Sequence, residues 1–494
     1  MSLKKNVIAN YLGQGWTALM GIAFVPLYIE YLGIEAYGLI GVFAILQAWL
    51  TLLDMGMTPT LSREMARYTA GAHTAQSIRD LLRSLEVICF AIASVCGMVI
   101  WFVSAWLATH WLQAEKLPVE EVAQAISIIG FVVALRFIES LYRGAILGLQ
   151  KQVWLSVVGS GLATLRWVGA VGVLVWVAPN IEAFFIWQGL MSVLTILAFA
   201  FAVHRHLPSS AQTARFSWFQ LKSIWRFAGG MMATTLLVLL LMQVDKIILS
   251  RMLNLEMFGY YTLAGTVATV LYLLTAPITQ AYYPRFTELV AKGDIAGLIR
   301  IYHQGAQLVS VLIVPAALML VFFGENFLLL WTGNQVLTHN VAPLLALLAL
   351  GTLLNGLMHI PYMLTLAYGW PGFAVRQNVV AVILLVPAII WVTPRYGAIG
   401  AAWIWVILNG GYVLIGVHYL HRHLLQTEKW RWYVSDIALP SLVVASVVIA
   451  SRAMHPTILP QMWEIAWLLV SGVVAFLGAA FASTTLRGLF RSGI

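Results

Sequence analysis

The sequence predicts an all-α polytopic membrane protein of about 14 transmembrane helices. The 494-residue chain is 61% hydrophobic and only 10% charged, whereas a soluble protein would carry about a quarter charged residues. Its mean hydropathy is +0.88. Apolar stretches of about 18–25 residues, each long enough to cross a bilayer, recur along the whole chain.

The spans follow one another with short connections. The longest connections, near 59–83 and 204–225 on one side of the membrane and 324–340 on the other, have room for an amphipathic helix but for no folded domain. In chain order, the expected spans are 7–29, 38–58, 84–108, 122–148, 153–178, 181–203, 226–250, 259–283, 301–323, 341–366, 377–393, 396–418, 433–453 and 462–482.

The basic residues give the orientation of these spans. An even number of spans puts both termini on one side, and with that side inside, 20 of the 28 lysines and arginines fall in inner segments. Basic residues concentrate on the cytoplasmic side of multi-pass proteins. We therefore expect cytoplasmic N- and C-termini and an outward 324–340 loop. The net charge of +9 then needs no nucleic-acid partner.

An internal repeat relates the two halves of the chain. "YLGIEAYGL" follows the first span and "MLNLEMFGY" follows the seventh, so that Glu35 and Gly38 correspond to Glu256 and Gly259. Both copies fall on the same side of the membrane, which makes the repeat parallel, an arrangement known among transporters. We expect six-helix lobes at 1–207 and 225–424, a cytoplasmic linker at 208–224 and a C-terminal helix pair at 425–494.

Several motifs in order resemble one family. "PLYIEYLGIEAYGL", "LLDMGMTPTLSRE", "DKIILSRMLNLEMFGYYTLA", "YYPRFTELVAKGD" and "RYGAIGAAW" are similar to stretches of the Wzx-type polysaccharide (O-antigen or exopolysaccharide) flippases, over roughly residues 1 to 420. Their superfamily also contains multidrug and toxin extrusion pumps and lipid II flippases. Twelve spans are commonest in the family, so the last pair here is a departure that keeps a lipid II flippase open as an alternative.

The resemblance implies a function and its setting. The fold would be a V-shaped pair of lobes that opens alternately to each side of the bacterial inner membrane. The substrate would be an undecaprenyl-pyrophosphate-linked oligosaccharide, moved from the cytoplasmic to the periplasmic leaflet. Membrane lipids and other polysaccharide assembly proteins would be its further partners. No cofactor is implied, and coupling to H⁺ or Na⁺ stays open.

Charged residues inside the fourth and fifth spans are the candidate substrate site. A charge near the bilayer centre costs at least about 2.5–3.5 kcal/mol, so such residues point to function. Arg136, Glu139 and Arg143 share one face of the fourth span. Arg136 and Arg166 each lie 14 residues from the inner end of their span, about 21 Å along the helix.

Three arginines against one glutamate leave a net positive patch, which suits a pyrophosphate because guanidinium forks match phosphate oxygens. The alternative is a structural network in which Glu139 pairs with Arg136 or Arg143 within its own helix. Arg166 has no acid in its own span. The sequence alone leaves both interpretations open.

Other polar residues are assigned weaker roles. Asp54 in the second span, and Asp245 with Lys246 in the seventh, are candidates for inter-lobe contact or ion coupling, or for buried helix contacts. Because neighbours on a helix face about 100° apart, Asp245 and Lys246 are not expected to be simple partners. We expect span-end acids such as Glu86 and Asp436, and the paired histidines His204, His206, His421 and His423, to be solvated.

Loop length and the charge of the central patch distinguish a flippase from other classes of membrane protein. A membrane polysaccharide polymerase or ligase would need a sizeable outer loop with catalytic side chains, and we expect no such loop and no enzyme activity. An ion-coupled exporter of cationic drugs would favour an acidic cavity, whereas this patch is basic. The histidines form no pattern typical of a metal site.

Overall fold

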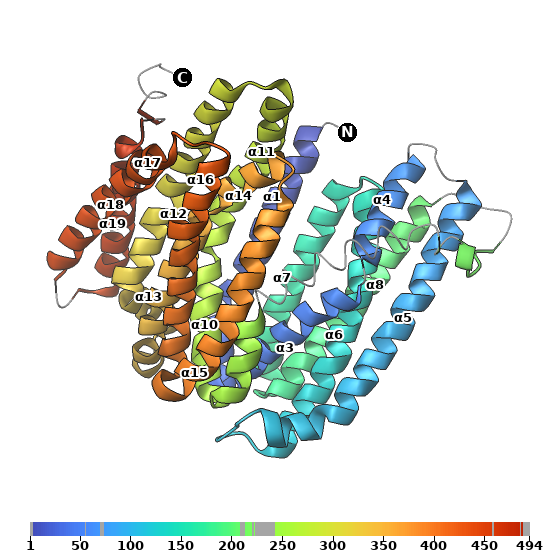
Figure 1. The fold of residues 1–494 in the computed structure, drawn as a ribbon. Coiled ribbons are helices and arrows are strands. Elements are labelled where there is room, and N and C mark those ends of the chain that lie inside the picture. Colours follow the sequence, from blue (N-terminus) through green and yellow to red (C-terminus); the bar gives the residue numbers. More distant parts are fainter. Residues whose placement is uncertain are drawn as a thin grey trace. The chain divides into compact units, whose positions relative to one another are not determined.

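The computed structural model describes residues 3–54, 56–69, 74–207, 213–219, 222, 243–456, 459–484 and 486–487. Most of these residues are helical (Figure 1), and the one isolated β-bridge among them joins Gln113 to Asn254. Eleven described helices are long and apolar enough to cross a membrane. The all-α transmembrane prediction is confirmed. The number 14 stays a prediction, because most of the expected span 226–250 lies outside the described residues.

The chain divides into two compact units, residues 1–259 and 260–494. The predicted lobe boundaries stay predictions, since the expected linker at 208–224 is described only at 213–219 and 222. The helices of the first unit are α1 (Leu3–Ala23), α2 (Val25–Leu32), α3 (Ile34–Leu53), α4 (Met57–Thr69), α5 (Ala75–Trp106), the π-helix η1 (Leu107–Trp111), α6 (Val119–Gly148), α7 (Gln152–Trp176) and α8 (Ile181–His206), and α10 (Leu255–Thr269) begins in it.

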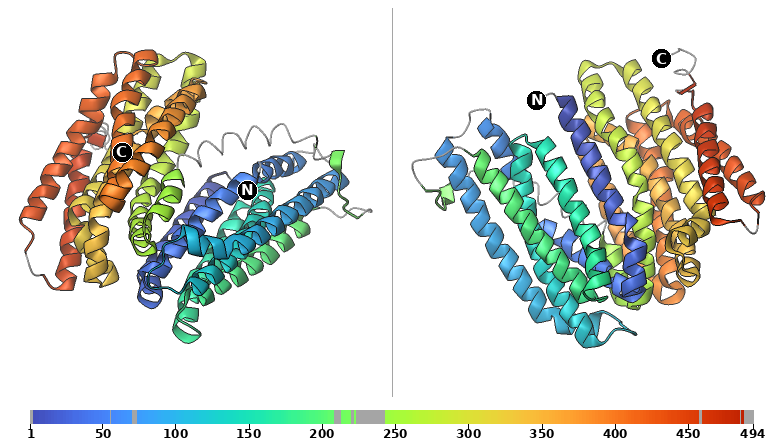
Figure 2. Two further views of the ribbon diagram at one scale, coloured as in Figure 1. Left: turned by 60° about the horizontal axis from the view of Figure 1, so that its bottom comes forward. Right: turned by 180° about the vertical axis from the view of Figure 1, so that it is seen from behind.

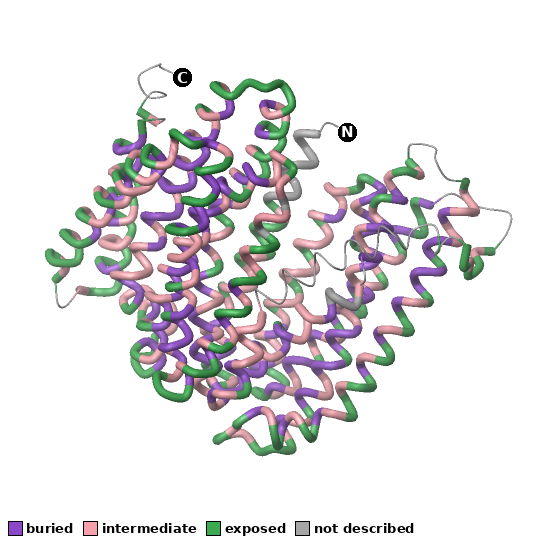
Figure 3. Tube along the Cα trace, viewed as in Figure 1, coloured by how far each residue is buried: buried purple, intermediate pink, exposed green. Residues whose placement is uncertain are grey.

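Helix α6 is the centre of the first unit. It packs against α3, α4, α5 and α8, and α7 packs against α1 and α8. Buried residues, purple in Figure 3, recur along α6, and Ile129, Val133 and Phe137 are among the buried residues of this helix. The predicted connection at 59–83 contains the amphipathic helix α4, which buries Leu61 and Met65. A central helix with buried polar neighbours is where a transmembrane site can be built.

The repeat is visible as a reciprocal contact within residues 1–259. A Cβ atom on Gly38 would collide with the carbonyl oxygen of Leu255, and one on Gly259 would collide with that of Ile34. Ile34 and Leu255 are equivalent in the repeat, as are the two glycines. Only a residue without a side chain allows this close backbone approach, which explains why glycine stands at both positions.

The second unit is built around α12. Its helices are α11 (Leu271–Lys292), α12 (Ile295–Thr332), α13 (Gln335–Leu357), α14 (His359–Ala367), α15 (Pro371–Gly411), the π-helix η2 (Tyr412–Gly416), α16 (Val417–His423), α17 (Lys429–Arg431), the π-helix η3 (Trp432–Ala438), α18 (Leu439–Ala453) and α19 (Gln461–Ala482). Helix α12 packs against α11, α13, α18 and α19. Helices α18 and α19, red in Figures 1 and 2, lie side by side.

The structure bears on two predicted connections in this unit. The expected break between the spans 377–393 and 396–418 is present within α15, because the backbone leaves helical geometry at Gly397, where φ is +59° and ψ is −150°. The prediction of a long loop at 324–340 is wrong, because α12 continues to Thr332 and α13 begins at Gln335. The polar Asn326 is accommodated in the helix since it donates to Glu464 at 2.8 Å and accepts from Arg452 at 2.9 Å.

Candidate functional site

The predicted charged residues meet at one cavity in the first unit. Its volume is 250 Å³, and α6 supplies Arg136, Glu139 and Arg143 to its wall, while Arg166 comes from α7. The shared-face prediction for the three α6 residues is thus confirmed. Three guanidinium groups surround one carboxylate here. Such a cavity attracts an anionic ligand.

Arg166 is paired with the acid of the neighbouring helix. Its Nη2 lies 3.1 Å from Oε2 of Glu139 and donates at 3.1 Å to Oγ1 of Thr195 on α8. The side chains of Arg166 and Glu139 are 11% and 18% exposed. Among the described residues the ion pair of Glu139 is therefore interhelical and not within α6, and the alternative of a structural network stays open. The carboxylate holds Arg166 in place while leaving it on the cavity wall.

Arg136 is held by neutral groups. It donates from Nη1 to Gln47 of α3 and from Nη2 to Gln188 of α8, both at 3.0 Å, and its guanidinium carbon lies 4.8 Å from the ring centroid of Phe43. These contacts orient the guanidinium without neutralising its charge. Sequence reasoning missed both glutamines, although an amide inside an apolar span was a usable signal.

Arg143 differs from the other two arginines. It lines the same cavity one helical turn beyond Glu139, its residue is exposed, and it makes no hydrogen bond or ion pair with any described residue. A guanidinium with five donors and no protein acceptor can bind an incoming anion at little cost in broken bonds.

Asp54 lies at a second cavity that shares a wall with the first. This cavity has a volume of 310 Å³, and Gln47, Arg136 and Ser140 line both cavities. The Asp54 carboxylate accepts from the Thr58 backbone nitrogen at 3.1 Å and from its hydroxyl at 2.7 Å. Asp54 therefore caps the start of α4, and it also brings a carboxylate near the arginine cluster.

The second predicted pair lies apart from both cavities. Lys246 Nζ is 3.5 Å from Oδ1 of Asp245, and the side chains are 37% and 15% exposed. The two groups are within ion-pair distance, but each also has a further interaction, so the expectation that they are not simply each other's partner stays a prediction. Neither residue lines the arginine cavity or the Asp54 cavity.

The expectation that span-end acids and paired histidines are solvated is wrong for Glu86, Asp436 and His421. It is confirmed for the exposed histidines His204, His206 and His423. Glu86 is 4% exposed and accepts from the Tyr142 hydroxyl at 2.9 Å, while Asp436 and His421 are fully buried in the second unit. Their partners come from helices distant in sequence. In the described ranges, no group of three or more His, Cys, Asp or Glu residues is placed to hold a metal ion.

Comparison with known proteins gives the family context. Residues 3–290 match the family described as "Polysaccharide biosynthesis protein". A Shigella flexneri protein named for O-antigen transport is 20% identical over 411 residues, covering 82% of this chain and 95% of that protein. The lipopolysaccharide biosynthesis protein WzxC of Escherichia coli strain K12 is 24% identical over 230 residues, 46% of each chain.

A solved structure shares the fold over nearly the whole chain. The lipid II flippase MurJ, in an inward closed conformation, matches with a TM-score of 0.73 at 13% identity, covering 98% of this chain and 99% of that chain. At this identity the likeness shows the fold alone. The predicted transporter fold is confirmed by it.

Proposed function

The chain belongs to the polysaccharide biosynthesis protein family, and on this premise we propose that it flips an undecaprenyl-pyrophosphate-linked oligosaccharide across the bacterial inner membrane. The direction is from the cytoplasmic to the periplasmic leaflet, by alternating access, with both termini in the cytoplasm. The protein makes and breaks no covalent bond of its substrate and is a Wzx-type flippase rather than an enzyme.

The observation that carries the proposal is the arginine cavity. A pyrophosphate diester carries about two negative charges, and guanidinium groups bind phosphate oxygens through two parallel hydrogen bonds. Three arginines face one glutamate in the cavity, and Arg143 makes no hydrogen bond or ion pair with another described residue. Arg143 is the proposed first contact of the pyrophosphate, and Arg136 and Arg166 are its proposed further contacts.

The two held arginines are suited to release the substrate again. The Arg166–Glu139 pair and the amide contacts of Arg136 remain available when the cavity is empty, so neither charge is left without partners. A site that satisfies its own charges in the empty state binds the anion less tightly than one that does not. A transporter needs such moderate affinity in order to release its substrate.

The alternatives differ in the cargo they require. The basic lining suits a lipid II flippase as well, since that substrate also contains a pyrophosphate, but does not suit an exporter of cationic drugs. The connection between α12 and α13 is only Gly333 and Asn334, which offers no scaffold for the catalytic side chains of a polymerase or ligase.

A reconstitution experiment tests the function. The full-length protein in liposomes should move a fluorescent undecaprenyl-pyrophosphate-linked oligosaccharide from the inner to the outer leaflet, where an added glycosidase trims it. In cells, depletion should accumulate the same lipid-linked oligosaccharide in the inner leaflet. If the liposomes move a cationic dye but not the lipid-linked oligosaccharide, the assignment is wrong.

A further inference from the structure

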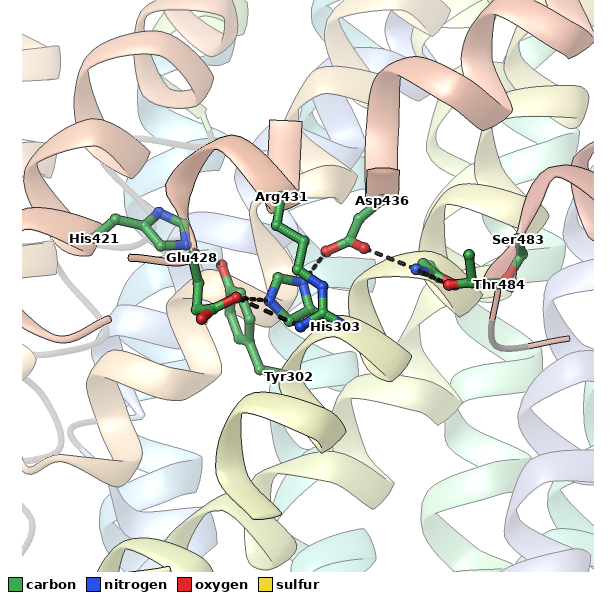
Figure 4. A network of polar contacts seen from close by, with 9 residues as sticks. Tyr302, His303, His421, Glu428, Arg431, Asp436, Ser483 and Thr484 are labelled. Atoms are coloured by element: carbon green, nitrogen blue, oxygen red, sulfur yellow. Dashed lines mark hydrogen bonds and ion pairs between the residues drawn. The ribbon is translucent and has the colours of Figure 1, made fainter. Parts of the chain in front are cut away.

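A buried polar network joins the beginning of α12 to the C-terminal helices of the second unit (Figure 4). His303 of α12 is 2% exposed and lies between two carboxylates. Its Nδ1 bonds to Oδ2 of Asp436 in η3, and its Nε2 is 2.9 Å from Oε2 of Glu428, which precedes α17. The network is outside the arginine cavity and has no part in the function proposed above.

The hydrogen-bond chemistry of this trio requires a proton. A neutral imidazole has one N–H donor, and an ionised carboxylate can only accept. Glu428 also accepts from the Thr427 hydroxyl at 3.1 Å and lies 3.6 Å from Arg431 Nη1, while Asp436 accepts from the Gln307 amide at 2.9 Å. The second oxygen of each carboxyl group is thus occupied as an acceptor, and both bonds to His303 form only when the trio holds one proton more than a neutral ring supplies.

The environment of Glu428 favours its ionised form, which accepts hydrogen bonds. Burial alone would raise the pKa of Glu428, but the hydrogen bonds from His303 and Thr427 outweigh it and hold the pKa below its ordinary value. The two carboxylates approach opposite ring nitrogens, so they do not converge on a common point as metal ligands would.

The network fastens two separate chain segments to α12. Asp436 is in the π-helix η3, a kind of distortion that is frequent at functional sites. Gln307, one turn after His303, donates to Asp436 and to Thr484 at 3.0 Å and accepts from the Ser483 hydroxyl at 2.8 Å. The segments that lead into α18 and out of α19 are thus held through one His–Gln pair.

Solvent can reach the trio through a pocket of 490 Å³. His303, Gln307, Arg300, Arg431 and Thr484 line it. His303 stands eight residues into α12, about 12 Å from the end predicted to face the cytoplasm. The pocket gives the proton a path to water on that side.

The titratable and charged groups that surround His303 are Arg300 and Tyr302 of α12, His421 of α16, Glu428, Lys429 and Arg431 at α17, and Tyr433 and Asp436 of η3. Among these cations, Arg431 lies 3.6 Å from Glu428 and Arg300 lines the pocket beside His303.

We propose that His303, Asp436 and Glu428 form a proton-binding site whose bound proton fastens the C-terminal helix pair to α12. Below the pH at which the proton leaves, both ring nitrogens donate and the attachment is closed. Above it, one ring nitrogen presents a lone pair to a carboxylate, one bond is lost, and the segment 429–438 opens more often from α12.

Hydrogen–deuterium exchange of the full-length protein in nanodiscs tests this. Protection of residues 429–438, corrected for the intrinsic pH dependence of exchange, should fall about tenfold from about pH 6 to about pH 9. In Glu428→Gln the side-chain amide donates to Nε2, so neutral His303 suffices and protection should not vary with pH. Protection in Asp436→Asn should likewise not vary with pH, and this variant replaces Glu428→Gln if the latter folds poorly.

The matched control is a second histidine–glutamate pair, at the connection between α18 and α19. Nε2 of His455 faces both oxygens of Glu464 at 3.0 Å, so a neutral ring satisfies that pair. Glu464→Gln should keep the pH-dependent protection of 429–438 seen in the unaltered protein. Constant protection in the unaltered protein, or the same pH dependence in Glu428→Gln and Asp436→Asn, would overturn the proposal.

Discussion

Arg166 of α7 and Glu139 of α6 form an ion pair across two helices, with 3.1 Å between Nη2 and Oε2. The pair lies on the wall of the arginine cavity. It therefore has a structural reason to exist and also a position from which it can contact a ligand. Measuring stability and transport separately distinguishes these two roles.

The first prediction concerns this pair. Arg166→Gln should lower the free energy of unfolding by roughly 1–3 kcal/mol, because it leaves Glu139 charged and without its cation. Adding Glu139→Gln should restore most of that stability, since the remaining amides can bond to each other. Transport in liposomes should stay low in the double variant. If transport recovers along with stability, Arg166 is a structural residue only.

The second prediction concerns Arg143. Because it makes no hydrogen bond or ion pair with a described residue, Arg143→Ala should leave the melting temperature unchanged. Flipping should fall by about tenfold or more, since a charge-assisted bond to phosphate is lost, and Arg143→Lys should retain part of it. Arg205, exposed at the end of α8, supplies the control: Arg205→Ala should leave flipping unchanged. Equal effects at both positions would count against a binding role.

The third prediction concerns the crossing of the two repeats. Gly38→Ala and Gly259→Ala each place a methyl group against a backbone carbonyl, and each should cost about 1–3 kcal/mol of stability. Gly265 in α10 is the control, because no atom lies within 4 Å of a Cβ added there. Gly265→Ala should be neutral or stabilising, since alanine favours helix. The melting temperatures of the three variants in detergent test this prediction. Unchanged melting temperatures for both Gly38→Ala and Gly259→Ala would contradict the close backbone approach.

Hydropathy predicted the helices because a bilayer leaves few alternatives for an apolar stretch of spanning length. It was wrong at 324–340, where Glu325 and Asn326 end the apolar run. Helix α12 continues there because Arg452 and Glu464, far along the chain, satisfy Asn326. A single sequence carries no sign of such partners.

The candidate site was predictable where it depended on one helix. Arg136, Glu139 and Arg143 share a face by spacing alone, and they do line one cavity. The pairing of Glu139 with Arg166 depends on how α6 and α7 pack, and the burial of Asp436 depends on His303 reaching it. Both are tertiary contacts, which periodicity does not encode.

The fourth prediction concerns topology. If both termini are cytoplasmic, a reporter inserted at Asn334, in the short connection between α12 and α13, should lie outside. Alkaline phosphatase should be active at Asn334 and inactive when fused after residue 494, and green fluorescent protein should give the reverse pattern. Active phosphatase at both positions would exclude an even number of spans with this orientation.

The fifth prediction concerns Asp54, which both caps α4 and lines the cavity next to the arginine cluster. Asparagine caps a helix about as well as aspartate, so Asp54→Asn should change stability by only about 0.5 kcal/mol. If the carboxylate takes up the coupling ion, an imposed H⁺ or Na⁺ gradient should no longer accelerate flipping in this variant, while slow gradient-free flipping persists. Asp245→Asn, which lies outside both cavities, should keep the gradient response. A full response in Asp54→Asn together with its loss in Asp245→Asn would move the coupling site to Asp245.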